Sequence, residues 1–139
     1  MAMTADECRA RFASARSLRL ATADALGEPH IVPATFALTG DVIVIAVDHK
    51  PKRHANLKRL ANIRENPAVT LLVDHFEEDW ERLWWVRADG RAQVLENELA
   101  HALVDSLVNK YEQYRDRRPG GPVIRIEVSR WSGWVARRQ

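Results

Sequence analysis

The segment from His49 to Arg64 is the strongest chemical signal in the sequence, because its charges have one sign. It holds several lysines and arginines and no acidic residue. It follows an apolar, strand-like run and continues into a helical pattern. Its cations, with the free N–H groups of a first helical turn, could therefore hold a phosphate or a carboxylate-rich ligand. A solvated helix face has the same composition, but the position beside a core strand favours binding. The cationic residues are Lys50, Lys52, Arg53, Lys58, Arg59 and Arg64.

A cluster of tryptophans is the second signal. Three of the five tryptophans, Trp80, Trp84 and Trp85, lie within six residues. In a strand, Trp84 and Trp85 point to opposite faces, so one can fill the core while the other faces a ligand ring or a partner subunit. Burying two adjacent indoles in a small monomer is difficult. The pair therefore predicts that at least one belongs to a pocket or an interface.

Other kinds of site find little support in the sequence. The five histidines form no HExxH pattern and the single cysteine forms no CxxC pattern, so we expect no metal. The serines lack a nucleophile-elbow context, and Cys8 has no evident base nearby in sequence. The six glycines are too dispersed for a GxGxxG or Walker loop. A phosphate would have to be held by side chains.

The spacing of turn residues predicts an antiparallel arrangement of strands. Thr4 and Glu7 have the spacing of a capping box and predict a helix over 5–17. A hairpin follows, then an apolar strand, a helix between 48 and 66, two more strands and a helix capped by Asn97. Gly90 could mark a bulge. The predicted strands are 18–22, 30–38, 42–47, 69–76, 83–95 and 123–128, with 131–136 as a possible extension of the sheet.

The length and net charge of the chain limit the number of domains and the kinds of partner that we expect. The 139 residues suffice for a single domain, spanning 1–139, and the net charge of +2 is too small to favour nucleic acid or a membrane surface. The N-terminal residues lack the apolar stretch of a signal peptide or a membrane span. We expect a cytoplasmic α+β protein with about six antiparallel strands in a barrel and two to three helices.

Two sequence elements carry a resemblance to a known family. These are the run Asn62-Ile63-Arg64-Glu65-Asn66-Pro67 and the pattern Val-Arg-x-x-Gly-x-Ala at 86–92. Together with the order of elements, they resemble the pyridoxamine-phosphate-oxidase-like proteins, whose fold is the six-stranded FMN-binding split barrel. The likeness covers nearly the whole chain. It is similar above all to the actinobacterial branch that depends on the deazaflavin coenzyme F-420.

The resemblance implies a homodimer with two cofactor sites at the subunit interface. It places the phosphate near Lys58 and Arg59, which match the family's basic pair, with Asn62 close by. Lys50 and Lys52 are further candidates, although the spacing from His49 to Lys58 departs from the shorter family pattern. The implied ring-lining strand holds Pro33, Ala34 and Thr35, and the strand bordering the cofactor and the partner subunit holds Trp84, Trp85 and Arg87.

The activity implied is hydride transfer from reduced F-420 to a small electrophile such as an enone or a quinone. Such a reaction requires placement of the ring carbon near the acceptor, and the sequence names no catalytic acid or base. One alternative is an FMN-dependent oxidoreductase of the same fold. Another is a protein that binds a cofactor or haem without turnover, with His49, His54 or His75 as an axial ligand. Binding of single-stranded nucleic acid is a more remote possibility.

Overall fold

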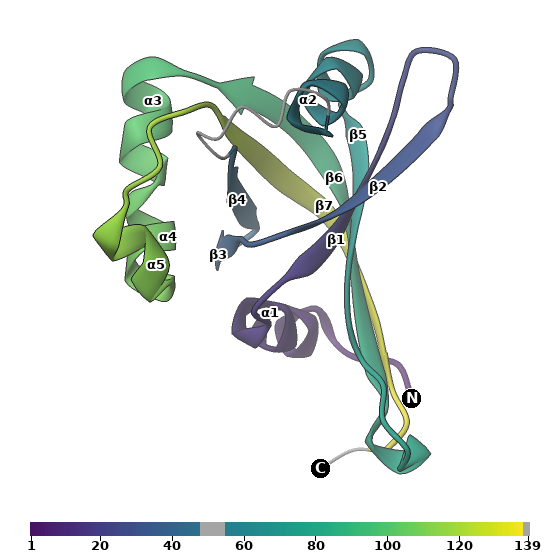
Figure 1. Cartoon of the computed structure of the whole chain (residues 1–139). Helices are drawn as coiled ribbons and strands as arrows, with labels where there is room; N and C mark the ends of the chain where they lie inside the picture. Colours follow the sequence, from purple (N-terminus) through teal and green to yellow (C-terminus); the bar gives the residue numbers. More distant parts are fainter. Residues whose placement is uncertain (48–54, 138–139) are drawn as a thin grey trace.

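The sheet of this protein is a curled half-barrel of antiparallel strands, seen in a computed structural model that describes residues 1–47 and 55–137 (Figure 1). Its seven strands run in the order β2-β1-β5-β6-β7-β4-β3. The β2 and β3 strands therefore form its two edges. The strands are β1 (Leu18–Ala23), β2 (Pro29–Ala34), β3 (Ala37–Thr39), β4 (Val42–Ala46), β5 (Ala68–His75), β6 (Trp84–Leu95) and β7 (Val123–Val135).

Helices cover the concave side of this sheet. Figure 1 shows α1 near the lower part of the sheet and the group α3–α5 beside β3 and β4, whereas α2 lies at the upper end near β1 and β6. A short 3-10 turn joins β5 to β6. The helices are α1 (Ala5–Ser14), α2 (Ala55–Glu65), α3 (Asn97–Leu103), α4 (Asp105–Lys110) and α5 (Glu112–Asp116), and the 3-10 turn is Trp80–Arg82.

The start of α1 follows the predicted capping box. The Glu7 N–H donates to the Thr4 hydroxyl at 3.2 Å, and the Thr4 N–H donates to the Glu7 carboxylate at 3.0 Å. Two free donors of the first turn are thereby satisfied. The helix buries Cys8 and Phe12, and the Phe12 ring meets the rings of Phe36 and Trp131 edge to face.

Alternation along the strands separates a buried inner face from an outer face. In β1, Leu18 and Leu20 are buried while Arg19 between them is exposed. The β5 strand alternates in the same way, with buried Leu71 next to half-buried Leu72. The inner residues belong to one apolar cluster with those of α1 and α2. Burial of this face against the helices is the main source of stability.

The long central pair β6–β7 confirms the bulge predicted at Gly90. The register between these strands shifts between Asp89 and Gly90. A Cβ at Gly90 would lie 2.3 Å from the Glu127 carbonyl oxygen, so only glycine allows this approach. The β7 strand continues without a break through 131–135, as predicted for the extension of the sheet.

The strand and helix counts differ from the sequence-based expectation. The predicted strand 30–38 is divided, because the chain leaves the β2 edge after Ala34 and pairs with β4 only from Ala37. The Phe36 N–H between them donates to the Tyr111 hydroxyl instead of to a strand. The described residues therefore form seven strands rather than six, with five α-helices rather than two to three.

The helical region after β6 is also different from the prediction. Asn97 is not the N-cap: it is the first residue of α3, has a φ of 64°, and follows Glu96 as the cap. Leu99 in α3 is 68% exposed. Val104 and Tyr111 end the first two segments, so three short helices replace one.

No helix in the described part of the chain is long and apolar enough to span a membrane.

Candidate functional site

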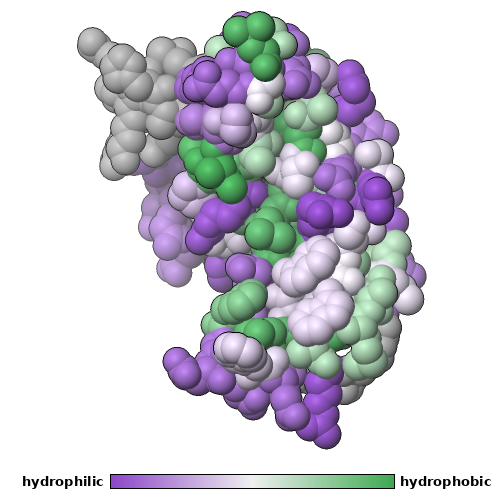
Figure 2. All heavy atoms as spheres, turned by 90° about the vertical axis from the view of Figure 1, so that its right-hand side faces the viewer, coloured by the Kyte–Doolittle hydropathy of each residue, from purple (hydrophilic) through white to green (hydrophobic). Residues whose placement is uncertain are grey.

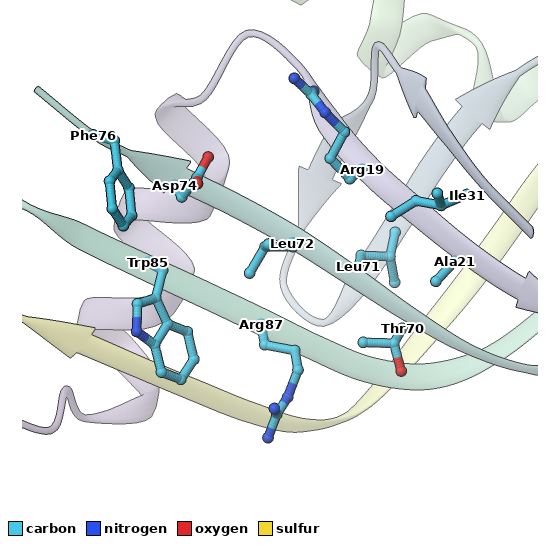
Figure 3. A pocket seen from close by; sticks show the side chains of 10 residues that line it. All are labelled: Arg19, Ala21, Ile31, Thr70, Leu71, Leu72, Asp74, Phe76, Trp85 and Arg87. Atoms are coloured by element: carbon cyan, nitrogen blue, oxygen red, sulfur yellow. The ribbon is translucent and has the colours of Figure 1, made fainter. Parts of the chain in front are cut away.

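The outer face of the sheet carries an open hollow of about 440 Å³ on β1, β2, β5 and β6 (Figure 3). Its floor is apolar, with Ala21, Leu72 and the 64% exposed Ile31. This is the side of the sheet away from α1 and α3–α5, and Figure 2 shows apolar side chains gathered along its middle between hydrophilic ones. The full lining is Arg19, Ala21, Ile31, Thr70, Leu71, Leu72, Asp74, Phe76, Trp85 and Arg87.

The two adjacent tryptophans lie on opposite faces, as their spacing predicts. Trp84 packs against the inner apolar cluster, and the Arg11 guanidinium lies 5.2 Å from the centre of its ring. Trp85 lines the outer hollow beside Phe76. Trp134 is paired with Trp85 in the neighbouring strand and is 40% exposed. The outer face thus offers indole surface to a ligand or a second protein.

A polar rim borders the apolar floor. The Arg87 guanidinium lies 5.9 Å from the centre of the Trp85 ring, and its Nε atom lies 3.4 Å from the Asp89 carboxylate. Asp89 also accepts a hydrogen bond of 2.9 Å from the Thr70 hydroxyl. These contacts fix the direction of Arg87 along the hollow. The rim therefore combines a cation, a hydroxyl and an aromatic ring within one short stretch of β5 and β6.

The basic pair predicted to hold a phosphate lies on α2. Lys58 is exposed, with its ammonium 3.9 Å from the Asp24 carboxylate. Arg59 is only 8% exposed, and burial lowers the pKa of its guanidinium. Asn62 is 1% exposed and donates to the Thr22 hydroxyl at 3.0 Å, so it anchors α2 to β1.

The predicted ring-lining residues lie at the end of β2. Pro33 is exposed on the outer face, whereas Ala34 packs against the inner cluster. Thr35 follows the strand, and its hydroxyl lies 2.7 Å from the Tyr114 hydroxyl. Lys50 and Lys52 lie outside the described residues. Of the residues predicted to bind the cofactor, only Trp85 and Arg87 line the same described hollow. The predicted residues on α2 and Thr35 lie elsewhere in the chain.

A second hollow, of about 420 Å³, was missed by the sequence reasoning. It lies on the concave side, between the α1–β1 connection, the β2–β3 connection and α5. Its residues come from three distant parts of the chain, so no local spacing could have grouped them. Thr35 is the one predicted site residue among them. The lining is Arg16, Thr35, Tyr111, Gln113 and Tyr114.

With these sites located, comparison with known proteins decides the family. The model of the family described as "Pyridoxamine 5'-phosphate oxidase" matches residues 4–135. The chain belongs to the pyridoxamine 5'-phosphate oxidase family. The match covers all seven strands and α1–α5, and it confirms the family resemblance. No curated protein sequence matches the chain.

Several solved structures share the fold of this chain. A FAD-binding protein from Mesorhizobium loti is 24% identical with a TM-score of 0.73, covering 96% of this chain and 95% of that one. A conserved hypothetical protein from Mycobacterium tuberculosis is 22% identical with a TM-score of 0.75, covering 97% and 86%. The haem storage protein from Vibrio cholerae is 19% identical with a TM-score of 0.68, covering 94% and 90%. At these identities the likeness shows the fold.

Proposed function

We propose that this protein is a homodimeric oxidoreductase whose flavin-type cofactor is coenzyme F-420. In the proposed reaction, the reduced cofactor transfers hydride to a small electrophilic organic molecule. The observation that carries the proposal is the outer hollow, where Trp85 and Arg87 border an apolar floor in a member of the pyridoxamine 5'-phosphate oxidase family. We further place the protein in the cytoplasm, because Cys8 is its only cysteine and no intrachain disulfide can form.

The side chains present fit a flavin-type group. A tricyclic ring system is planar and largely apolar, and the outer hollow offers Ile31, Leu72 and an indole face to such a ring. An anionic tail needs cations, and α2 carries Lys58 at the surface and Arg59 beneath it. An anion near α2 would meet the positive charges of both side chains.

The chemistry expected of these residues is binding and orientation. A reduced deazaflavin, when bound, supplies the hydride. Arg87 and Trp85 would fix the plane of the ring through a cation and a stacking surface, and the apolar floor would keep water away from the reacting carbon. Lys58 and Arg59 would hold the phosphate. The reduced product would take its proton from solvent, and the oxidised ring would release one to solvent, so no side chain is assigned to carry a proton.

Dimerisation would complete this site. Ile31 and Phe76 are 64% and 71% exposed on one face, which is unusual for large apolar side chains. A second copy laid across the outer face would cover them and turn the open hollow into an enclosed one. The face also presents both Arg19 and Asp74, so two copies related by a two-fold axis can pair opposite charges.

The test is a fluorescence titration of the purified protein with F-420 and, separately, with FMN. Lys58→Ala is the informative variant because Lys58 is exposed and its loss leaves the core intact. Arg64→Ala is the matched control, since Arg64 is an exposed cation near the end of the same helix. We expect Lys58→Ala to weaken F-420 binding by about tenfold and Arg64→Ala to leave it within about twofold.

Other results of this titration would change the proposed cofactor or the proposed function. Tight FMN binding with none of F-420 would replace the cofactor and keep the reaction class. A Soret band on addition of haem, with no binding of either flavin-type ligand, would instead favour a role in haem storage, like that of the Vibrio cholerae protein. Equal losses in Lys58→Ala and Arg64→Ala would contradict the phosphate site on α2.

A further inference from the structure

The second hollow, lined by Arg16, Thr35, Tyr111, Gln113 and Tyr114, has an excess of positive charge without a counter-ion. The Arg16 guanidinium lies over the Tyr111 ring, 4.6 Å from its centre. The Lys110 ammonium lies 3.7 Å from the centre of the Phe36 ring and 5.3 Å from that of Tyr111. In the described part of the chain, no carboxylate forms an ion pair with either cation.

Both cations retain donors that the described residues do not use. Arg16 makes one side-chain hydrogen bond, from Nη2 to the Lys110 carbonyl oxygen at 3.3 Å, of the five that a guanidinium can donate. The Lys110 ammonium is buried and has no hydrogen-bond partner within 1–47 and 55–137. Burial, with the nearby Arg16 charge, lowers the pKa of Lys110 to about 8. The fold thus bears the cost of two neighbouring like charges.

The hydroxyl groups of the hollow point to the same kind of ligand. Tyr111 is fully engaged: its hydroxyl donates to the Arg16 carbonyl oxygen at 2.8 Å and accepts from the Phe36 N–H at 3.2 Å. Thr35 and Tyr114 share one hydrogen bond of 2.7 Å, although the two hydroxyls carry two hydrogens. One donor of this pair therefore remains for a ligand.

We propose that this hollow binds the carboxylate of a small aromatic acid. The carboxylate would accept from the Arg16 guanidinium and from the free hydroxyl of the Thr35–Tyr114 pair, and the ring of the acid would lie against the half-buried Tyr114 ring, because Tyr111 is only 5% exposed. Lys110 contributes positive potential from behind Tyr111 without contacting the ligand. This hollow lies on the opposite side of the sheet from the outer hollow and shares no lining residue with it, so binding of the acid does not depend on the proposed function.

The test compares benzoate with benzamide, which has the same size and no charge. Binding is followed by the backbone amide NMR signals of the cofactor-free protein. Benzoate is expected to shift the signals of Thr35, Gln113 and Tyr114 at saturation, with an affinity at least about tenfold above that of benzamide, as expected for charge-assisted hydrogen bonds. Equal affinity of the two compounds, shifts confined to other residues, or no binding of benzoate up to its solubility limit would overturn the proposal.

Substitutions of the two cations test which of them contacts the carboxylate. Arg16→Gln should weaken benzoate binding by about tenfold, and Lys110→Met by about two- to threefold, since of these two cations only Arg16 touches the ligand. Arg117→Gln is the control, because Arg117 is an exposed cation just after α5 that does not line the hollow. An unchanged affinity in Arg16→Gln would also overturn the proposal.

The same preparation separates this proposal from the proposed function. If F-420 and FMN both fail to bind while benzoate shifts the predicted signals, the acid site stands and the oxidoreductase assignment fails. If a cofactor binds while benzoate does not, the oxidoreductase proposal stands and the acid site is wrong.

Discussion

The two faces of strands β1, β5 and β6 are built from alternate residues of the same segments, yet only one face is completed by the chain itself. The inner face is continuously apolar and is covered by α1 and α2, with Leu20 and Leu71 fully buried. The outer face mixes Arg19, Thr70 and Arg87 with exposed apolar side chains. The contrast indicates that the inner face maintains the fold, and it motivates our proposal that the cofactor and a second copy of the chain bind to the outer face.

The largest effect should follow from a cavity on the inner face. Leu20→Ala removes a fully buried side chain from the centre of the half-barrel. It should lower the free energy of unfolding by about 2–5 kcal/mol, measured by urea denaturation. Leu26→Ala is the control: Leu26 is 94% exposed at the β1–β2 turn and should change stability by less than about 0.5 kcal/mol. Similar losses in both variants would remove the distinction on which the comparison depends.

A substitution on the outer face should weaken dimerisation rather than destabilise the fold. Ile31→Glu places a carboxylate on the proposed dimer surface, where burial without a partner is costly. We expect the dimer dissociation constant to rise by about a hundredfold, measured by analytical ultracentrifugation, with the unfolding cooperativity retained. Leu99→Glu is the matched control, because Leu99 is 68% exposed on α3, away from this face. A monomeric wild-type protein would contradict the proposed dimer directly.

The bulge in β6 provides a third comparison. Gly90→Ala forces a Cβ to within 2.3 Å of the Glu127 carbonyl oxygen, so the central β6–β7 pair must shift. The expected loss is about 2 kcal/mol, measured by thermal or urea unfolding. Gly27→Ala should cost about 1 kcal/mol, because Gly27 has a φ of 84° but open space around its Cβ position. A smaller loss at Gly90 than at Gly27 would show that the strands separate easily at the bulge.

Local patterns in the sequence were sufficient for most of the inner face. The capping box of Thr4 and Glu7, the apolar run of β4 and the opposite directions of Trp84 and Trp85 each depend on neighbouring residues, and each is found in the structure. The break at Phe36 was not predictable, because it depends on the Tyr111 hydroxyl 75 residues away. The second hollow was missed for the same reason.

The smallest effect concerns Lys110, a cation placed against the Phe36 ring on the inner side of the molecule. Its pKa falls from 10.5 to about 8, through burial first and the Arg16 charge second. Below about pH 8 the folded and unfolded states both carry this proton, so the native state bears the full cost of the buried charge. Between about 8 and 10.5 the unfolded state binds more protons, and the contribution of Lys110 to stability therefore rises with pH.

Lys110→Met retains much of the side-chain volume and removes the charge. It should be more stable than the wild type at neutral pH, and this advantage should fade as the pH rises from about 8 to 10.5. Urea unfolding of both proteins across this range measures the difference. An advantage that stays constant with pH would mean that the native state does not lower the pKa of Lys110, and would contradict burial of its charge.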